Sequence, residues 1–196
     1  QGFAWGQHGF KSKVGPYDST IAAPLIIRPT SKDAKKTAGR VVEAPVSGVD
    51  LPPTFFAQAG IELPWKMHGR DLSSQLSQPH TKWAAPTMLV HTGKSYGSAT
   101  DQIPAKGDKA LYHGPGVPWY VLLAEGKFKY VRTFVEGEPE ELYNLDADPD
   151  EITNLALSAE HSKTLRRMRA AAVAELKRTD AALVNSMPRP STIAKR

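Results

Sequence analysis

The sequence contains no cysteine, so this chain by itself has no disulfide bond, thiolate metal site or cysteine nucleophile. Long apolar runs are also missing, because none approaches the roughly 18 residues that a membrane-spanning helix requires. The first residue is Gln1 rather than methionine, and no leader of the charged-then-apolar type precedes the first motif. Since the chain opens inside a glycine-rich loop, we expect it to be the C-terminal part of a longer protein.

The composition is that of an ordinary globular protein. The 196 residues, of which 40% are hydrophobic and 23% charged, suffice for one domain with a sizeable core or for part of a larger domain. A net charge of +5 permits an anionic partner, but lysine and arginine are spread along the chain apart from short clusters at 32–36 and 163–169. Without interleaved aromatic and basic residues, this distribution favours a solvated surface over a nucleic-acid interface.

The first 28 residues combine a loop with an apolar run. Gly2, Gly6 and Gly9 lie close together around His8, and glycines at this density allow the backbone to approach a ligand closely. Leu25-Ile26-Ile27 follows and predicts a buried strand. We therefore expect a functional loop that delivers the chain into a sheet.

A helix is expected between Asp50 and Gly60. Asp50 is a preferred N-cap residue, the two prolines after Leu51 suit a first helical turn, and Gly60 suits a helix end. The residues at near-helical spacing that we assign to the core are Leu51, Phe55, Phe56 and Ala59. Further along, Val41–Val46 could extend a sheet edge, residues 87–91 form a candidate strand, and residues 92–117 form a long loop.

Residues from 118 onward carry the clearest strand pattern. Two β-rich runs, 119–123 and 127–132, flank Glu125-Gly126 and predict a hairpin, to which residues 141–143 add a third antiparallel strand. In the second run the aromatic side chains share one face and the lysines, including Lys129, share the other. This alternation predicts a half-buried sheet with its lysines in solvent.

Two helix signals lie near the C-terminus. Residues 148–151 have the sequence of a helix start, with Asp148 as cap, Pro149 at the first helical position and Glu151 reaching back to the cap. From Ser162 to Leu183 apolar residues recur at helical spacing, and the basic residues lie mostly on the other face, so the apolar stripe is expected to pack on the core.

Three stretches in series resemble segments of the sulfatase family. The first comprises Gln1-Gly2, Gly6-Gln7-His8-Gly9, Lys13, Tyr17-Asp18 and Pro24-Leu25-Ile26. The second comprises Val49-Asp50-Leu51-Pro52-Pro53-Thr54, Ala59-Gly60-Ile61, Pro64 and Gly69-Arg70-Asp71-Leu72. The third comprises Lys129-Tyr130-Val131-Arg132, Glu141-Leu142-Tyr143-Asn144-Leu145, Asp148-Pro149, Glu151 and Asn154-Leu155. Each motif alone is a weak signal, but the three in order cover most of residues 1–156.

The resemblance implies an α/β fold, the C-terminal part of an alkaline-phosphatase-like sulfatase, with a small antiparallel sheet packed against a C-terminal helix. It implies that residues 1–117 belong to the catalytic domain and residues 118–186 to a C-terminal subdomain, followed by a disordered tail at 187–196. The implied activity is that of a sulfuric ester hydrolase, with a sulfate ester such as a sulfated sugar as substrate. Sulfatases are often exported, so a periplasmic or secreted location is compatible with the family, and the sequence leaves the compartment open.

Two residues of the opening loop take family roles by resemblance. Gln1 matches the last ligand of a divalent cation, usually Ca²⁺, for which an amide oxygen is a suitable hard ligand. Lys13 matches the lysine that contacts the sulfate and the leaving-group oxygen, where a fixed ammonium stabilises the developing negative charge. Lys11 is the rival for this role, but the family spacing favours Lys13.

Three histidines are further candidates. His8 either lines the pocket or holds the turn by hydrogen bonds, and we favour the second interpretation. His91, His113 and the loop at 92–117 could contribute to substrate selection, although a lone histidine after a strand is more often structural.

The sequence also departs from the family pattern. Sulfatases convert the first residue of a Cys/Ser-x-Pro-x-Arg motif to a formylglycine nucleophile, and this chain has no such motif. We therefore expect the chain alone to be inactive. Ala22 replaces a common arginine and Tyr17-Asp18 replaces Tyr-Glu, which leaves the substrate subclass open. The rival functions are a phosphodiesterase or phosphonate hydrolase of the same superfamily, and a non-catalytic module that binds anionic glycans.

Overall fold

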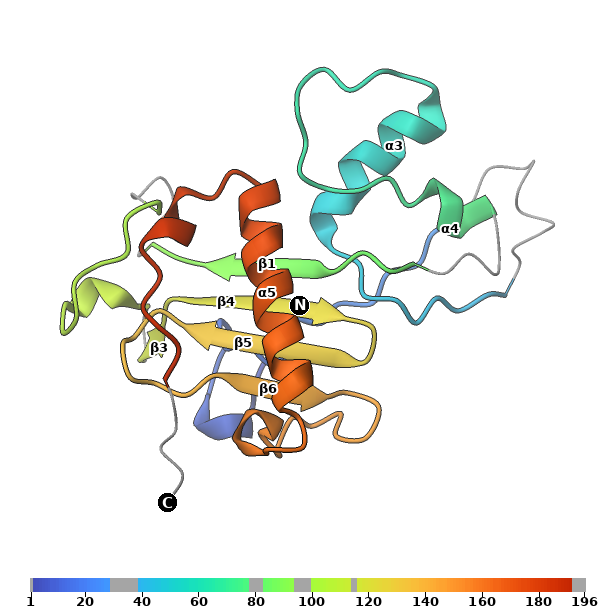
Figure 1. Ribbon diagram of the computed structural model, residues 1–196. Helices are drawn as coiled ribbons and strands as arrows, with labels where there is room; N and C mark the ends of the chain where they lie inside the picture. The colour runs from blue at the N-terminus through green and yellow to red at the C-terminus, as the bar shows by residue number, and fades with distance from the viewer. Residues whose placement is uncertain (1, 29–38, 78–82, 94–99, 114–115, 192–196) are drawn as a thin grey trace. The chain divides into compact units, whose positions relative to one another are not determined.

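The computed structural model describes residues 2–28, 39–77, 83–93, 100–113 and 116–191 (Figure 1). The chain forms two compact units, one made of Gln1–Ala23 with Met88–Arg196 and the other of Pro24–Thr87. Gln1, residues 29–38 and the last five residues of the expected tail lie outside the described residues. Within the described part of the chain, no helix combines the length and apolar character needed to cross a bilayer.

An antiparallel sheet of four strands organises the larger unit, in the order β1-β4-β5-β6 (Figure 1). The strands are β1 (Thr87–His91), β4 (Tyr120–Glu125), β5 (Phe128–Thr133) and β6 (Glu141–Asn144). Glu125 pairs with Phe128 and Gly126 has φ 56°, so the predicted hairpin and meander are confirmed. The predicted strand at 87–91 is also present, and it lies beside β4 in this same sheet. A separate two-stranded sheet pairs β2 (Tyr112–His113) with β3 (Val117–Pro118).

Helix α5 (Ser162–Arg178) covers one face of the sheet (Figure 1). Its apolar stripe packs into the core with strand residues, through Met168 and Ala172 in one cluster and Leu176 in another. The predicted helix is confirmed from Ser162 but ends five residues before Leu183. Asp180 has φ 56°, a left-handed conformation that interrupts the helix, and the 3₁₀ helix η5 (Ala182–Asn185) then buries Leu183.

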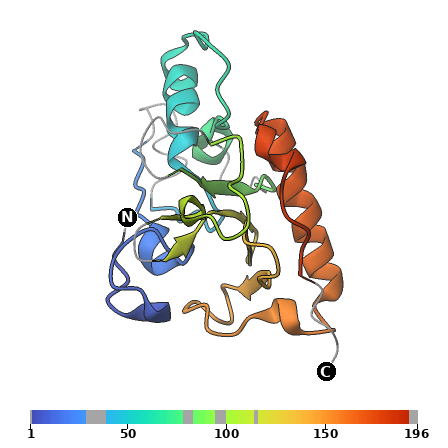
Figure 2. The same cartoon turned by 90° about the vertical axis from the view of Figure 1, so that its left-hand side faces the viewer.

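The N-terminal segment covers the opposite face of the sheet (Figure 2). It contains η1 (Gln7–Gly9) and α1 (Asp18–Ile21), and its apolar side chains pack against Tyr120, Leu122 and Val131. The prediction of a half-buried sheet is therefore wrong. Lys129, which was expected in solvent, is only 1% exposed, because a segment more than a hundred residues away in sequence covers its face.

The expected helix after Asp148 is absent from the structure. The Asp148 carboxylate accepts hydrogen bonds from the amides of Ile152 (3.1 Å) and Thr153 (2.8 Å), and Glu151 has φ 58°. A left-handed residue cannot continue a right-handed helix, so the chain forms a turn there and only the short η4 (Leu155–Leu157) follows. The Glu151 side chain is 2% exposed and faces the sheet rather than its own cap.

The smaller unit contains η2 (Gly48–Asp50), α3 (Leu51–Ala59) and α4 (Ser73–Ser77). The predicted helix is confirmed, and Gly60 ends it with φ 67°. The core assignment is wrong, because Phe55 is 60% exposed whereas Thr54 is buried. The Thr54 hydroxyl donates to the Asp50 carbonyl (2.6 Å) and accepts from the Leu72 amide (2.9 Å), so this face of α3 holds the chain that follows the helix.

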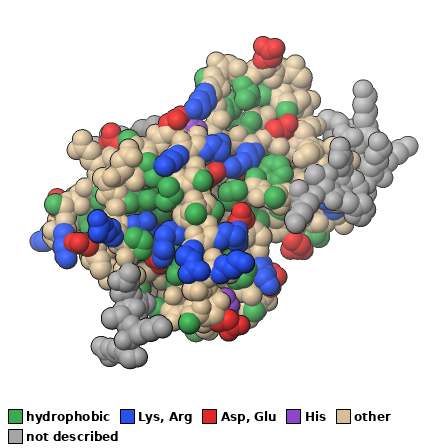
Figure 3. Space-filling view, in the orientation of Figure 1, with side chains coloured by type: hydrophobic (Ala, Val, Ile, Leu, Met, Phe, Trp, Pro, Cys, Tyr) green, Lys and Arg blue, Asp and Glu red, His purple; other side chains and the backbone are tan. Residues whose placement is uncertain are grey.

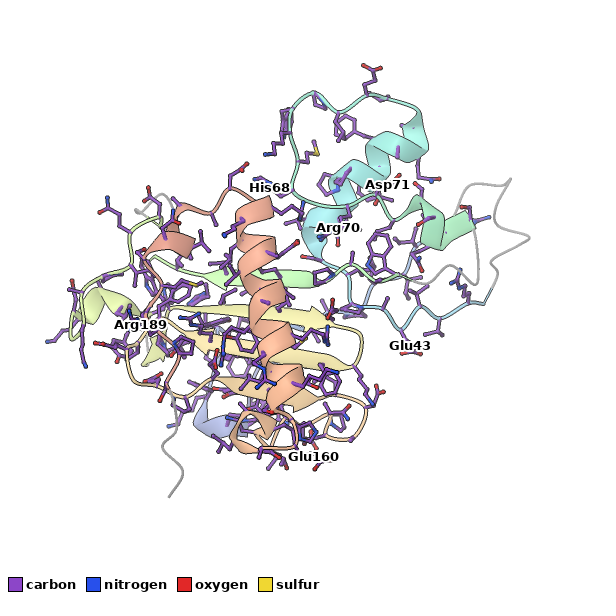
Figure 4. The ribbon with its side chains drawn as sticks, viewed as in Figure 1. Glu43, His68, Arg70, Asp71, Glu160 and Arg189 are labelled. Carbon is purple, nitrogen blue, oxygen red and sulfur yellow. The ribbon has the colours of Figure 1, made fainter. Side chains whose placement is uncertain are left out.

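Asp50 has a different role from the one expected. Its buried carboxylate accepts from the amides of Ser47 (2.8 Å) and Arg70 (2.7 Å) and does not cap α3. Arg70, labelled in Figure 4, also donates from Nη1 to the Pro86 carbonyl (3.0 Å). Asp50 thus joins the chain before α3 to the chain after it.

Two expected strands of this unit are absent. Residues 22–28 and 41–46 have no strand structure, and Ile26 is 94% exposed. A strand requires a neighbour for its backbone donors and acceptors, and no strand among the described residues pairs with either run.

Candidate functional site

The glycine-rich loop closes on itself through backbone hydrogen bonds. The Gly2 amide donates to the Thr20 carbonyl (3.1 Å), and the Ala4 amide donates to the Ser12 carbonyl (3.0 Å). A Cβ atom at Gly2 would clash with the Ser19 carbonyl oxygen, so this close approach requires glycine. The Thr20 hydroxyl adds a buried bond to the Gly15 carbonyl (2.5 Å). The two ends of the loop are therefore fixed to each other.

His8 packs against neighbouring segments from inside this loop. Its ring stacks on Tyr17 with centroids 3.6 Å apart, and its Nε2 lies 3.0 Å from the Asp150 carbonyl oxygen. The Gln7 amide group donates to the Asp150 carboxylate (3.2 Å). These contacts hold the loop against the turn at Asp150, and a role of His8 toward substrate stays a prediction.

A buried ion-pair cluster fixes the second half of the loop. The Lys129 ammonium lies 2.7 Å from Asp18 Oδ1 and 2.6 Å from Glu151 Oε1, and Glu151 Oε2 accepts from the Asp18 amide (2.6 Å). Lys129 and Glu151 are almost completely buried, whereas the Asp18 side chain is 42% exposed. The Lys129 ammonium therefore joins three segments, namely β5, α1 and the turn that follows β6. The sequence analysis missed this cluster, because the two acids lie far from Lys129 in sequence and no local periodicity connects them.

Two phenols and a third carboxyl group, that of Glu141, lie next to the cluster. The Tyr143 hydroxyl donates to Glu141 Oε2 (2.8 Å), and the Tyr17 ring meets the Tyr143 ring edge-on at 6.3 Å. Burial raises the pKa of Glu141, and burial followed by the nearby Glu141 charge raises the pKa of Tyr17 well above its ordinary value, so this phenol stays protonated. Burial also raises the pKa of Glu151, and the Lys129 ammonium opposes that rise.

Lys13 is exposed on the loop, next to a backbone anchor on the sheet. Val14, the next residue, has φ 75°, and its carbonyl accepts from the Tyr120 hydroxyl (3.1 Å). Lys11 is also exposed. The backbone beside Lys13 is thus bound to β4, while the side chain extends from the surface.

His91 contacts the same tyrosine. Its ring stacks on Tyr120 at 5.1 Å and meets His113 edge-on at 4.9 Å. Burial lowers the pKa of His91, and the neighbouring His113 adds to the shift, which favours the neutral ring. The structure therefore brings His91 to the ring of Tyr120 and the backbone beside Lys13 to its hydroxyl, while substrate binding by His91 stays a prediction.

The described residues do not form a calcium site by themselves. No group of three or more histidine, aspartate or glutamate side chains in the described ranges is arranged to hold a metal ion. Two carboxylates beside the loop, Asp18 and Glu151, bind Lys129, and a third, Asp150, accepts from the Gln7 side chain. Gln1, the expected metal ligand, lies outside the described residues.

Solved structures of known proteins share the fold of this chain. No family model matches the chain. A solved structure, that of a protein in complex with its substrate D-glucosamine-2-N,6-O-disulfate, superimposes with a TM-score of 0.64 at 23% identity, over 92% of this chain and 33% of that one. The phosphonate monoester hydrolase of Agrobacterium radiobacter superimposes with a TM-score of 0.53 at 21% identity, over 71% of this chain and 26% of that one. The fold is thus part of an alkaline-phosphatase-like sulfatase fold, with the expected small antiparallel sheet packed against a C-terminal helix.

The curated relatives that the sequence matches are sulfatases. The chain is 29% identical over 175 residues to an N-acetylglucosamine-6-O-sulfatase of Bacteroides thetaiotaomicron, which covers 86% of this chain and 27% of the relative. The other curated relatives that it matches are also described as sulfatases. The chain is thus similar to sulfatases over most of its length. It spans about a quarter to a third of the length of the curated relatives it matches.

Proposed function

We propose that the chain supplies part of the active site of a sulfuric ester hydrolase. The observation that carries this proposal is the sequence similarity to sulfatases, which extends over 74–87% of the chain. Support also comes from the structure, because the loop with the candidate residue Lys13 is closed on itself and bound to the sheet at Val14. A loop held in this way can position a side chain for catalysis.

Lys13 is the residue that we assign to the sulfate. Cleavage of a sulfate ester concentrates negative charge on the sulfate oxygens and on the leaving-group oxygen. An ammonium that is positioned beforehand stabilises this charge more in the transition state than in the bound substrate. The loop therefore has the task of presenting Lys13, and the contacts of His8, Asp18 and Val14 hold its backbone in place.

The remaining parts of the site come from elsewhere. A formylglycine, which supplies the nucleophile in sulfatases, has no precursor motif in this chain, so residues outside it would have to provide that group. Gln1 is our candidate for one ligand of a divalent cation, Ca²⁺ in this proposal, because an amide oxygen suits a hard cation. The carboxylates of Asp18 and Glu151 already bind the Lys129 ammonium.

The substrate class that we propose is a sulfated sugar. Two of the relatives are described as acting on N-acetylglucosamine-6-O-sulfate and on hexuronate-2-O-sulfate groups, and one similar structure holds a disulfated glucosamine. Phosphonate monoester hydrolases share the fold, but the curated sequence relatives are sulfatases, which favours sulfate over phosphonate.

The test uses the protein translated from the complete reading frame. Its rates of hydrolysis of an aryl sulfate and of an aryl phosphonate monoester are compared under the same conditions, with and without added Ca²⁺. We expect a larger kcat/KM for the sulfate. A preference for the phosphonate would assign the protein to the rival class, and the absence of hydrolysis of both esters would leave the non-catalytic module as the better account.

A further inference from the structure

The outward face of α5 carries a stripe of cations that the proposed active site does not use. Lys163, Arg166 and Lys177 are exposed, and none of the three has an ion-pair partner among the described residues. At 3.6 residues per turn they fall within about 60° of arc, and at 1.5 Å per residue they extend over about 21 Å of the helix. Figure 3 shows lysine and arginine side chains gathered over the middle of the face on which α5 lies.

The other charged side chains of α5 are paired. Arg167 pairs with Glu125, and Arg169 Nε donates to Glu140 (2.8 Å). Glu175, the one acidic residue of the helix, is buried and accepts from Arg178 (2.7 Å). The helix therefore presents no exposed carboxylate that could neutralise the stripe.

Two of these three cations, Lys163 and Arg166, do not favour the helix itself, whereas Lys177 lies in the last turn, where a cation suits the helix dipole. The first turn contains Lys163 and no acidic residue, although the N-terminal end of a helix favours negative charge. Lys163 and Arg166 are three residues apart, and like charges at this spacing repel each other. Since helix stability does not account for Lys163 and Arg166, a ligand that brings negative charge to them would relieve an unfavourable arrangement.

We propose that this face of α5 binds a sulfated polysaccharide at a site separate from the loop of Lys13. The proposal rests on the proposed function for the sulfated sugar. A linear polyanion matches a linear row of cations, and the exposed positions between them, Ala170 and Ala174, offer no aromatic surface for stacking nucleic-acid bases. α5 and the N-terminal loop cover opposite faces of the sheet (Figure 2), so a polymer held on α5 occupies a surface distinct from that loop.

The test measures binding of the chain to heparin, used as a sulfated polysaccharide, at low and high salt. Arg166→Ala/Lys177→Ala removes two cations of the stripe. Lys109→Ala/Arg189→Ala is the matched control, because it removes an exposed lysine and an exposed arginine elsewhere that have no ion-pair partner among the described residues. We expect the stripe variant to bind heparin about tenfold more weakly than the wild type at low salt, and the affinity of the control to change less than about threefold. The affinity should depend less steeply on salt in the stripe variant only. Thermal melts should show the stripe variant folded, because alanine favours an exposed helix.

The outcomes separate this proposal from the proposed function. Equal losses in the two variants would overturn the α5 site, and so would duplex DNA that binds as tightly as heparin and depends on the same two residues. Lys13→Ala should keep heparin binding within about twofold, because surface charges this far apart are largely screened. In the protein from the complete reading frame, the stripe variant should hydrolyse a small aryl sulfate at the wild-type rate. Loss of that hydrolysis would contradict the separation of the two sites.

Discussion

Replacement of Lys129 by methionine tests the buried cluster that holds the loop. Lys129→Met keeps an unbranched side chain of similar length and removes the ammonium, so the packing on β5 changes little. Glu151, which is 2% exposed, then loses its counter-charge, and the Asp18 carboxylate loses its partner at 2.7 Å. Of the contacts within the cluster, only the bond between Glu151 and the Asp18 amide would remain.

The expected cost follows from the burial of each partner. Removal of one member of a buried ion pair costs about 3–5 kcal/mol, because the remaining charge is left without compensation. The Asp18 side chain is 42% exposed, so solvent screens its share and the lower end of the range applies. We expect a loss of about 3 kcal/mol from a total free energy of unfolding of about 5–15 kcal/mol. The variant should therefore fold but unfold at a clearly lower denaturant concentration.

The assay is urea unfolding followed by tryptophan fluorescence, with the free energy obtained by linear extrapolation. Lys129→Met/Glu151→Gln serves as the control, since it removes the uncompensated charge and should recover about 1–2 kcal/mol. Hydrogen exchange provides a local reading, in which the amides of Gly2 and Thr20 should exchange faster in Lys129→Met relative to those in β4. A loss below about 1 kcal/mol, with unchanged exchange in the loop, would refute the argument that this cation holds the segments together.

Two further predictions concern the same part of the molecule. Burial raises the pKa of Glu141, so its contribution to stability is complete below the unfolded pKa and is lost as the pH rises through the folded pKa. In urea unfolding, the free energy of unfolding should therefore decline less between pH 4 and pH 8 in Glu141→Gln than in the wild type. Parallel declines in the two proteins would contradict the assignment. Gly2→Ala should lower the free energy of unfolding by about 1–3 kcal/mol, because the new Cβ atom would clash with the Ser19 carbonyl. Gly48→Ala, with open space around the new atom, should leave the unfolding midpoint nearly unchanged. Equal effects of the two substitutions would show that the loop does not require glycine at position 2.

Local patterns were sufficient to predict the sheet and helix of the larger unit. The hairpin was predicted from two β-rich runs around Gly126, and α5 was predicted from its apolar stripe. Both signals depend on residues that are close together in sequence. The end of α5 was misplaced because the left-handed conformation of Asp180 is set by the packing of η5 rather than by a glycine.

Long-range contacts account for most of the differences. A period of two showed which side chains share a face with Lys129, but it could not show that the N-terminal segment covers that face. Glu151 fits a helix start locally, and yet the structure uses it as a buried partner of Lys129. Thr54 and Asp50 likewise accept hydrogen bonds from backbone amides that follow α3. Helical spacing does not predict such contacts. The family resemblance located the loop of Lys13, whereas the cluster that holds this loop became visible only in the structure.

The central claim is that Lys13 contacts the sulfate group during hydrolysis. Its direct test compares kcat and KM for an aryl sulfate in Lys13→Ala and in Lys11→Ala, both made in the protein from the complete reading frame. We expect Lys13→Ala to lower kcat by about 10²–10³, the effect of removing one group that stabilises a developing oxyanion, and Lys11→Ala to remain within about threefold of the wild type. Unchanged turnover in Lys13→Ala, or a larger loss in Lys11→Ala, would contradict the account.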